Sequence, residues 1–234
     1  NPDMKLLELE FENSSALDTA LVIKVTELLI GTINKIGSAS LVVSGGRTPL
    51  AFFHLLSQQV LDWSKVVVTL ADERWVDADH GDSNEKLVRE NLLINEAHAA
   101  EFIPLKNSAM DAVEGELQSE SDIESLGQFT VVILGMGDDG HTASLFPGAK
   151  TLALGLDMNS GRTAIAVMPT AAPHQRMTLT LPRLLDSQQI ILHIKGAGKQ
   201  GVLQAAQKGD DITELPIRAI LNQHVAPLSI FWAK

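Results

Sequence analysis

Two hydrophobic patterns alternate along the chain. Short apolar runs are typical of buried strands, whereas apolar residues at every third or fourth position are typical of amphipathic helices. The runs predict strands at 5–11, 40–43, 65–70, 102–105, 129–134, 162–168, 176–181, 189–194 and 227–232. The helical periods predict helices at 14–36, 49–57, 83–95, 108–119, 182–185, 199–207 and 215–221. This alternation predicts an α/β fold with a mainly parallel sheet covered by helices on both faces.

Local signals refine these boundaries. Ser14 or Ser15 is expected to cap the first helix, and Gly37 is expected to end it. Residues 5–11 alternate apolar and polar, which predicts a half-buried strand. The polar stretch 71–76 is predicted to be a turn.

Length and composition favour one domain. The 234 residues are 45% hydrophobic and 20% charged, which suits one sizeable packed core. No stretch rich in Pro, Gly or Ser divides the chain, so we expect a single domain over residues 1–234. Residues 1–3 precede Met4, which we expect to be the natural start.

Charge and composition also narrow the partners. A net charge of -11 disfavours nucleic acid, although a local basic pocket is compatible with it. The lack of cysteine excludes disulfides, thiol nucleophiles and Cys-based metal sites. No apolar run approaches the ~20 residues of a membrane span, and no signal peptide is visible. We therefore expect a cytoplasmic protein without a membrane partner, either a monomer or a small homo-oligomer.

Four polar loops directly follow predicted strands. They occupy residues 44–48, 71–76, 135–144 and 196–199. In a parallel sheet, ligands bind beyond the carboxyl ends of the strands, where such loops meet. The sequence therefore predicts a single site that these four loops share.

The first loop, SGGRTP (44–49), favours a phosphate site. Gly45 and Gly46 leave their backbone amides unobstructed, and the following helix N-terminus adds positive potential. The hydroxyls of Ser44 and Thr48 and the cation of Arg47 complete a set that can bind an anion. An ordinary strand–turn–helix joint capped by Thr48 is the alternative.

The third loop, GMGDDGH (135–141), matches the G-x-G-x-x-G dinucleotide fingerprint only by spacing. Asp138 and Asp139 would repel a pyrophosphate, and no long helix is predicted after Gly140. The same spacing recurs at Gly196, Gly198 and Gly201, where a Walker loop also fails because Gln200 replaces Ser or Thr. We therefore disfavour a nucleotide site in either loop.

His141 is the strongest candidate for catalysis. An imidazole can take a proton from water at neutral pH, and a nearby carboxylate can orient the ring. Metal binding by Asp138, Asp139 and His141 is a rival interpretation, but no second His cluster or H-E-x-x-H accompanies them. A Ser144 nucleophile is weaker still, because G-x-S-x-G is absent.

Charged residues in the other loops have two interpretations. Asp72, Glu73 and Arg74 are either a surface ion-pair cluster or part of the shared site. Lys199 is either a surface lysine or a second cation for phosphate. The remaining histidines are interpreted as surface or satisfied core residues, with His174 a candidate for the rim of the site: His54, His80, His98, His174, His193 and His224.

Five stretches in this order resemble the 6-phosphogluconolactonase family. They are SGGRTP (44–49), ADERWV (71–76), GMGDDGHTASLFPG (135–148), RMTLTLP (176–182) and GAGKQ (196–200). The resemblance implies a sugar-phosphate isomerase/deaminase-like fold, a small sugar-phosphate substrate, and no cofactor or metal. It also implies hydrolysis of 6-phospho-D-glucono-1,5-lactone to 6-phospho-D-gluconate in the pentose phosphate pathway.

The same resemblance implies roles for individual residues. His141 would be the general base with Asp139 beside it, and Arg74 would face the substrate as a third catalytic residue. The residues implied for substrate binding are Ser44, Gly45, Gly46, Arg47, Thr48, Asp72, Arg176 and Lys199. Arg47 is a departure, because the family often has Ser or Asn there.

Two other hypotheses stay open. The first is an aldose–ketose isomerase or deaminase such as a glucosamine-6-phosphate deaminase, which resembles this chain in the D-E turn and the D-G-H loop. Arg74 and the lack of an acid soon after His141 argue against it. The second is a non-catalytic sugar-phosphate sensor, which would normally carry an effector segment that we do not see.

Overall fold

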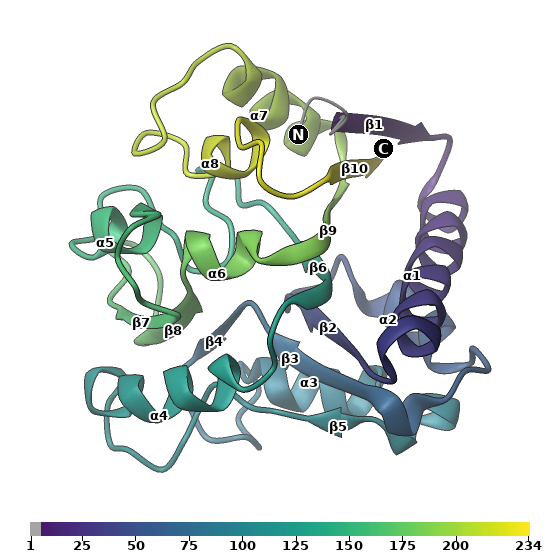
Figure 1. The fold of residues 1–234 in the computed structure, drawn as a ribbon. Coiled ribbons are helices and arrows are strands. Elements are labelled where there is room, and N and C mark those ends of the chain that lie inside the picture. Colours follow the sequence, from purple (N-terminus) through teal and green to yellow (C-terminus); the bar gives the residue numbers. More distant parts are fainter. Residues whose placement is uncertain (1–5) are drawn as a thin grey trace.

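A seven-stranded parallel sheet forms the centre of the protein (Figure 1). The computed structural model describes residues 6–234, so the predictions for Met4 and Lys5 lie outside the described residues. The strand order is β1-β10-β9-β6-β2-β3-β5, and each pair is parallel. The bounds are β1 Leu6–Phe11, β2 Ala39–Val43, β3 Val66–Leu70, β5 Glu101–Phe102, β6 Phe129–Leu134, β9 Ser187–Lys195 and β10 Leu228–Ala233. This sheet confirms the predicted fold class.

Three strands form a second, antiparallel sheet of order β4-β8-β7. They are β4 Asp72–Arg74, β7 Ala164–Val167 and β8 Arg176–Leu179. The prediction that 71–76 is only a turn is therefore wrong. Three charged residues are too few to show the alternation of apolar and polar positions that indicates a strand. The partner strand β8 lies about a hundred residues later, so only the tertiary structure shows the pairing.

The helices lie on both sides of the main sheet. In Figure 1, α1 and α2 lie on one side, and α4 and α6 lie on the other together with the small sheet. The bounds are α1 Ser14–Ile36, α2 Leu50–Ser57, α3 Asn84–Asn91, α4 Ala112–Glu124, α5 Leu152–Leu156, α6 Leu181–Leu185, α7 Ala197–Gln207 and α8 Arg218–Leu221. The short 3₁₀ helices are η1 Trp63–Lys65 and η2 Asn95–Ala99.

Capping explains where several helices begin and end. Asn13, rather than Ser14 or Ser15, caps α1, because its side-chain oxygen accepts from the amide of Ala16 at 2.8 Å. Gly37 ends the same helix with a φ of 88°, as predicted. Helix α4 begins later than predicted, because Asp111 accepts from the amide of Glu114. Helix α5 is not among the helices that the sequence pattern predicts.

Burial is highest in the inner strands. All residues of β2 and β6 are buried, as continuous apolar runs in a parallel sheet require. Strand β1 differs from the predicted half-buried strand, because Leu6, Leu7 and Leu9 are exposed. It lies at the sheet edge and pairs only with β10.

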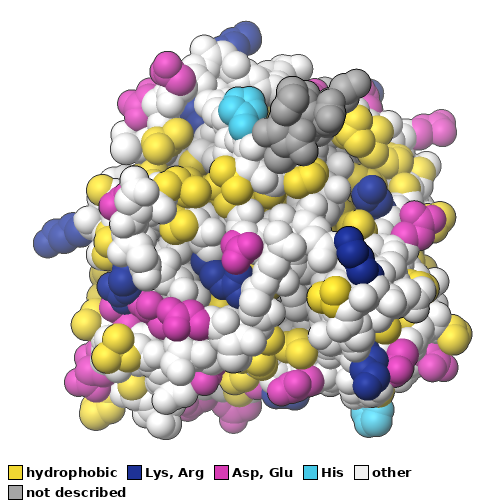
Figure 2. Space-filling model, in the orientation of Figure 1, with side chains coloured by type: hydrophobic (Ala, Val, Ile, Leu, Met, Phe, Trp, Pro, Cys, Tyr) yellow, Lys and Arg dark blue, Asp and Glu magenta, His cyan; other side chains and the backbone are white. Residues whose placement is uncertain are grey.

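The outer surface mixes charges of both signs. Figure 2 shows Lys and Arg side chains interspersed with Asp and Glu on one face of the protein. None of the helices within residues 6–234 combines the length and the apolar character that crossing a bilayer requires.

Candidate active site

One cavity of about 240 Å³ brings the four predicted loops together. Its lining includes residues 44–48, Asp72 with Arg74, the loop of His141, and Lys199. His141, Gly45 and Gly46 therefore line the same cavity. A single substrate can contact both the candidate base and the candidate phosphate loop only if they share a cavity in this way.

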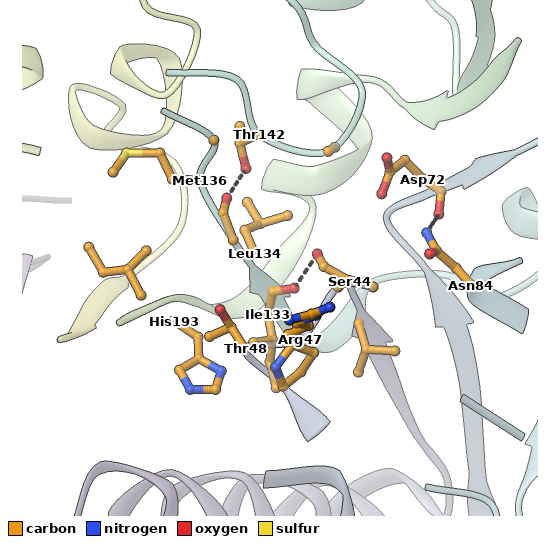
Figure 3. Close-up of a pocket in the computed structure, with 18 of the residues that line it drawn as sticks. Ser44, Arg47, Thr48, Asp72, Asn84, Ile133, Leu134, Met136, Thr142 and His193 are labelled. Atoms are coloured by element: carbon orange, nitrogen blue, oxygen red, sulfur yellow. Dashed lines mark hydrogen bonds between the residues drawn. The ribbon is translucent and has the colours of Figure 1, made fainter. Parts of the chain in front are cut away.

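The loop after β2 is built for a close backbone approach. A Cβ on Gly45 would lie 2.1 Å from Oδ1 of Asn84, and Gly46 has a φ of 89°. Ser44 donates its hydroxyl to the carbonyl of Ile133 at 3.0 Å, which ties the loop to β6 (Figure 3). Within the described residues, the amides of 45–48 donate to no protein acceptor. They are therefore available to an anion at the N-terminus of α2.

His141 is oriented by Asp139. Its Nδ1 lies 2.5 Å from Oδ1 of Asp139, and its amide donates to the same oxygen at 3.0 Å. Burial works to raise the pKa of Asp139, but the hydrogen bonds from His141 outweigh burial and hold that pKa below its ordinary value. The ring also packs on Phe146, with centroids 4.5 Å apart. Asp139 is thus a carboxylate that fixes the ring through Nδ1, and Nε2 has no hydrogen-bond partner among residues 6–234.

The backbone of this loop is already hydrogen-bonded. The amide of Gly137 donates to the carbonyl of His141 at 2.9 Å, and the amide of Gly140 donates to the carbonyl of Gly137 at 3.0 Å. A Cβ on Gly137 would lie 2.2 Å from the imidazole. These glycines serve the compact turn under His141, which agrees with the rejection of a nucleotide cradle.

The cavity is cationic although the protein is acidic. Its charged lining comprises one carboxylate and five cations: Asp72, Arg47, Arg74, Arg176, Lys195 and Lys199. Lys199 pairs with the exposed Asp138 at 2.9 Å, a contact that a bound anion can replace. The local charge therefore suits an anionic ligand, as a site for phosphate requires.

Two of these arginines are neighbours on adjacent strands of the small sheet. Arg74 of β4 lies directly opposite Arg176 of β8. Arg176 is buried, its Nε has no hydrogen-bond partner among the described residues, and its guanidinium lies over Phe146. Burial lowers the pKa of Arg176. Like charges on paired residues are unfavourable, so the two arginines favour an anionic ligand in the cavity that both of them line.

The two acids before Arg74 are internal. Asp72 accepts from the hydroxyl of Ser144 at 2.6 Å. Glu73 accepts from the amides of Arg74, Asn84 and Glu85. Burial raises the pKa of Glu73 to about 7 despite these bonds. The acids are therefore no surface ion-pair cluster, and the hydroxyl of Ser144 is held by Asp72.

Polar residues of the lining also lie outside the predicted loops, among them Asn84, His193 and Lys195. Asn84 donates its side-chain amide to the carbonyl of Asp72 at 3.0 Å (Figure 3). His193 is a core residue, as one of the two interpretations had it, but it is not satisfied: its Nε2 lies 3.4 Å from Oδ1 of Asp18 and has no hydrogen-bond partner among residues 6–234. Lys195 pairs with the same Asp18 at 2.8 Å. The position of His193 and Lys195 near the carboxyl end of β9 could have indicated that they line the site. Asn84 carries no such signal, because it belongs to helix α3.

The family model for glucosamine-6-phosphate isomerases and 6-phosphogluconolactonases matches residues 12–232. The chain belongs to this family. A 6-phosphogluconolactonase of Rhizobium meliloti (strain 1021) is 46% identical over 95% of this chain and 97% of that protein. One of Pseudomonas putida is 41% identical over 95% and 91%, respectively.

Solved structures agree with the family assignment. The crystal structure of a 6-phosphogluconolactonase from Shewanella baltica OS155 has a TM-score of 0.96 and 44% identity, with 98% of each chain covered. A monomeric glucosamine-6-phosphate deaminase with 16% identity and a TM-score of 0.79 shares the fold. Together these similarities confirm the predicted family, the α/β fold and the expectation that the chain is an enzyme.

Proposed function

We propose that the protein hydrolyses 6-phospho-D-glucono-1,5-lactone to 6-phospho-D-gluconate with His141 as general base. The observation that carries the proposal is that His141 and the open amides of the loop after β2 line one cationic cavity. The relatives named 6-phosphogluconolactonase support the same substrate. In this proposal the phosphate binds residues 44–48, Lys199 and Arg176.

Anchoring the phosphate fixes the far end of the substrate, C1, near His141. Nε2 of His141 takes a proton from a water molecule while the water oxygen forms a bond to C1. The electron pair of the carbonyl moves to its oxygen. Asp139 stabilises the imidazolium that forms, since its carboxylate already holds Nδ1.

Collapse of this intermediate opens the ring. The carbonyl re-forms, the bond between C1 and the ring oxygen breaks, and His141 returns the proton to that oxygen. Arg74 is our candidate to stabilise the oxyanion, because its cation lines the cavity together with His141. The amides of Gly137, Gly140 and His141 are less suited, since each already donates to a protein acceptor. Arg74 donates through Nη1 to the carbonyl of Asp82, which fixes its position at the cavity.

The first test is acid release from freshly generated 6-phosphogluconolactone, measured above its spontaneous hydrolysis. We expect turnover by the wild type and a fall in kcat of roughly 10²–10⁴-fold in His141→Ala. Binding of 6-phosphogluconate should persist in that variant, because the phosphate loop is untouched. His224→Ala, at an exposed position outside the cavity, is the matched control and should retain full activity.

Turnover at the wild-type rate in His141→Ala would contradict the proposal that His141 is the general base. Release of ammonia from glucosamine 6-phosphate, without acid release from the lactone, would instead support the deaminase hypothesis. Asp139→Asn separates charge from shape, and we expect its kcat to fall between those of the wild type and His141→Ala.

A further inference from the structure

Two histidines and an aspartate gather beside the cavity without a part in the proposed reaction. His80 and Asp82 lie in the loop that follows β4, and His174 lies in the loop that precedes β8. One potential ligand atom from each residue lies within 4.8 Å of the other two. His80 and Asp82 are exposed and His174 is half-buried, so an ion from solvent can reach all three.

We propose that His80, Asp82 and His174 bind a divalent transition-metal ion of the Zn²⁺ class. Two imidazole nitrogens and one carboxylate oxygen are a donor set that suits Zn²⁺, whereas Mg²⁺ and Ca²⁺ prefer oxygen ligands alone. Three protein ligands leave a fourth tetrahedral position for water, and the exposed loop leaves room for it.

The three groups are held together before any ion binds. Nε2 of His174 lies 2.9 Å from Oδ2 of Asp82, and the amide of Asp82 donates to Nδ1 of His80 at 2.9 Å. The two rings meet edge-on with centroids 5.4 Å apart. An ion would replace the contact between His174 and Asp82. His80 would also exchange the bond from the Asp82 amide for the ion, because a neutral imidazole that accepts at Nδ1 carries its proton on Nε2.

The backbone supports the same arrangement. His174 has a φ of 70°, a left-handed conformation that is unfavourable for a residue with a Cβ. Such conformations persist where surrounding contacts fix them, and they concentrate at binding sites. Here the unusual backbone accompanies a ring that reaches across to the other loop.

The site would join the two loops at the rim of the cavity. Arg74 donates to the carbonyl of Asp82 at 2.8 Å, and His174 lies two residues before Arg176. An ion at this cluster would therefore fasten together the segments that carry both opposed arginines. The inference concerns binding alone and does not depend on the proposed lactone hydrolysis.

The test uses the full chain after treatment with a chelator. Isothermal titration calorimetry with Zn²⁺ measures binding. The absorption spectrum of the Co²⁺-loaded protein is a second measurement and reports tetrahedral coordination. We expect one Zn²⁺ per chain and no comparable uptake of Mg²⁺. His80→Ala and His174→Ala should each weaken binding at least tenfold. His98→Ala, an exposed histidine elsewhere, and His141→Ala should each retain it, with folding checked by circular dichroism.

Absence of Zn²⁺ binding by the wild type would overturn the proposal. So would binding that survives in folded His174→Ala, or binding that is lost in folded His141→Ala, which would place the ion at the pair of His141 and Asp139.

Discussion

At the scale of single residues, the shape of the cavity depends on the lack of a side chain at Gly45. Gly45 leaves the space that Oδ1 of Asn84 occupies, and the amide of the same Asn84 side chain holds the carbonyl of Asp72. A methyl group at residue 45 must therefore displace a contact that positions a second wall of the cavity.

We predict that Gly45→Ala raises the KM for the lactone at least tenfold, because the new Cβ would lie 2.1 Å from Oδ1 of Asn84. Tenfold corresponds to about 1.4 kcal/mol of lost substrate binding. Steady-state kinetics measure it. Gly198→Ala in α7 is the control, because its Cβ would meet nothing within 4 Å, and its KM should not change. An unchanged KM in Gly45→Ala would show that the loop does not need this close approach.

At the scale of elements, β2 and β6 are joined by side chains as well as by their ladder. Their register pairs are Leu41 with Val131 and Val42 with Val132. Next to these pairs, the amide of Ser40 donates to the hydroxyl of Thr130 at 3.0 Å, and the amide of Thr130 donates to the hydroxyl of Ser40 at 3.2 Å. Both strands lead directly into loops of the site, so this reciprocal pair helps to fix the relative positions of those loops.

Thr130→Val should lower the free energy of unfolding by roughly 1–3 kcal/mol, because the buried amide of Ser40 loses its acceptor while the side-chain volume is kept. Urea denaturation measures the change. Thr26→Val is the matched control, since the buried hydroxyl of Thr26 has no partner among the described residues, and its loss should be neutral or stabilising. Equal destabilisation by the two variants would argue that the hydroxyl of Thr130 contributes nothing specific.

At the scale of the whole molecule, Glu73 joins the small sheet to helix α3. Its carboxyl accepts from three backbone amides, yet burial raises its pKa to about 7 from an ordinary value near 4.5. A raised pKa in the folded state means that the folded protein holds the proton more tightly than the unfolded chain. The resulting stabilisation is complete below pH 4.5 and is lost as the pH rises through 7.

We therefore predict that the free energy of unfolding of the wild type, relative to Glu73→Gln, falls between pH 5 and pH 8. The full shift corresponds to a change on the order of 3 kcal/mol. Urea denaturation at each pH gives the measurement, and Glu10→Gln at an exposed position controls for the loss of one charge. If this relative stability rises with pH instead, folding lowers the pKa of Glu73 and the prediction is wrong.

The sequence alone predicted the alternation of helices and strands, the four loops and most residues that line the cavity, including His141, Arg74 and Lys199. These features depend on local periodicity and on chemistry carried by neighbours in the chain. The roles of those residues in the reaction stay predictions.

Only the tertiary structure decided which distant segments meet. It paired β4 with β8, which placed Arg74 opposite Arg176, and it brought Asn84 against Gly45 and His174 against Asp82. No local pattern encodes these contacts, because each joins residues far apart in the sequence through packing of the whole chain. The same packing buried Glu73 and so set its proton affinity, which composition and charge could not predict.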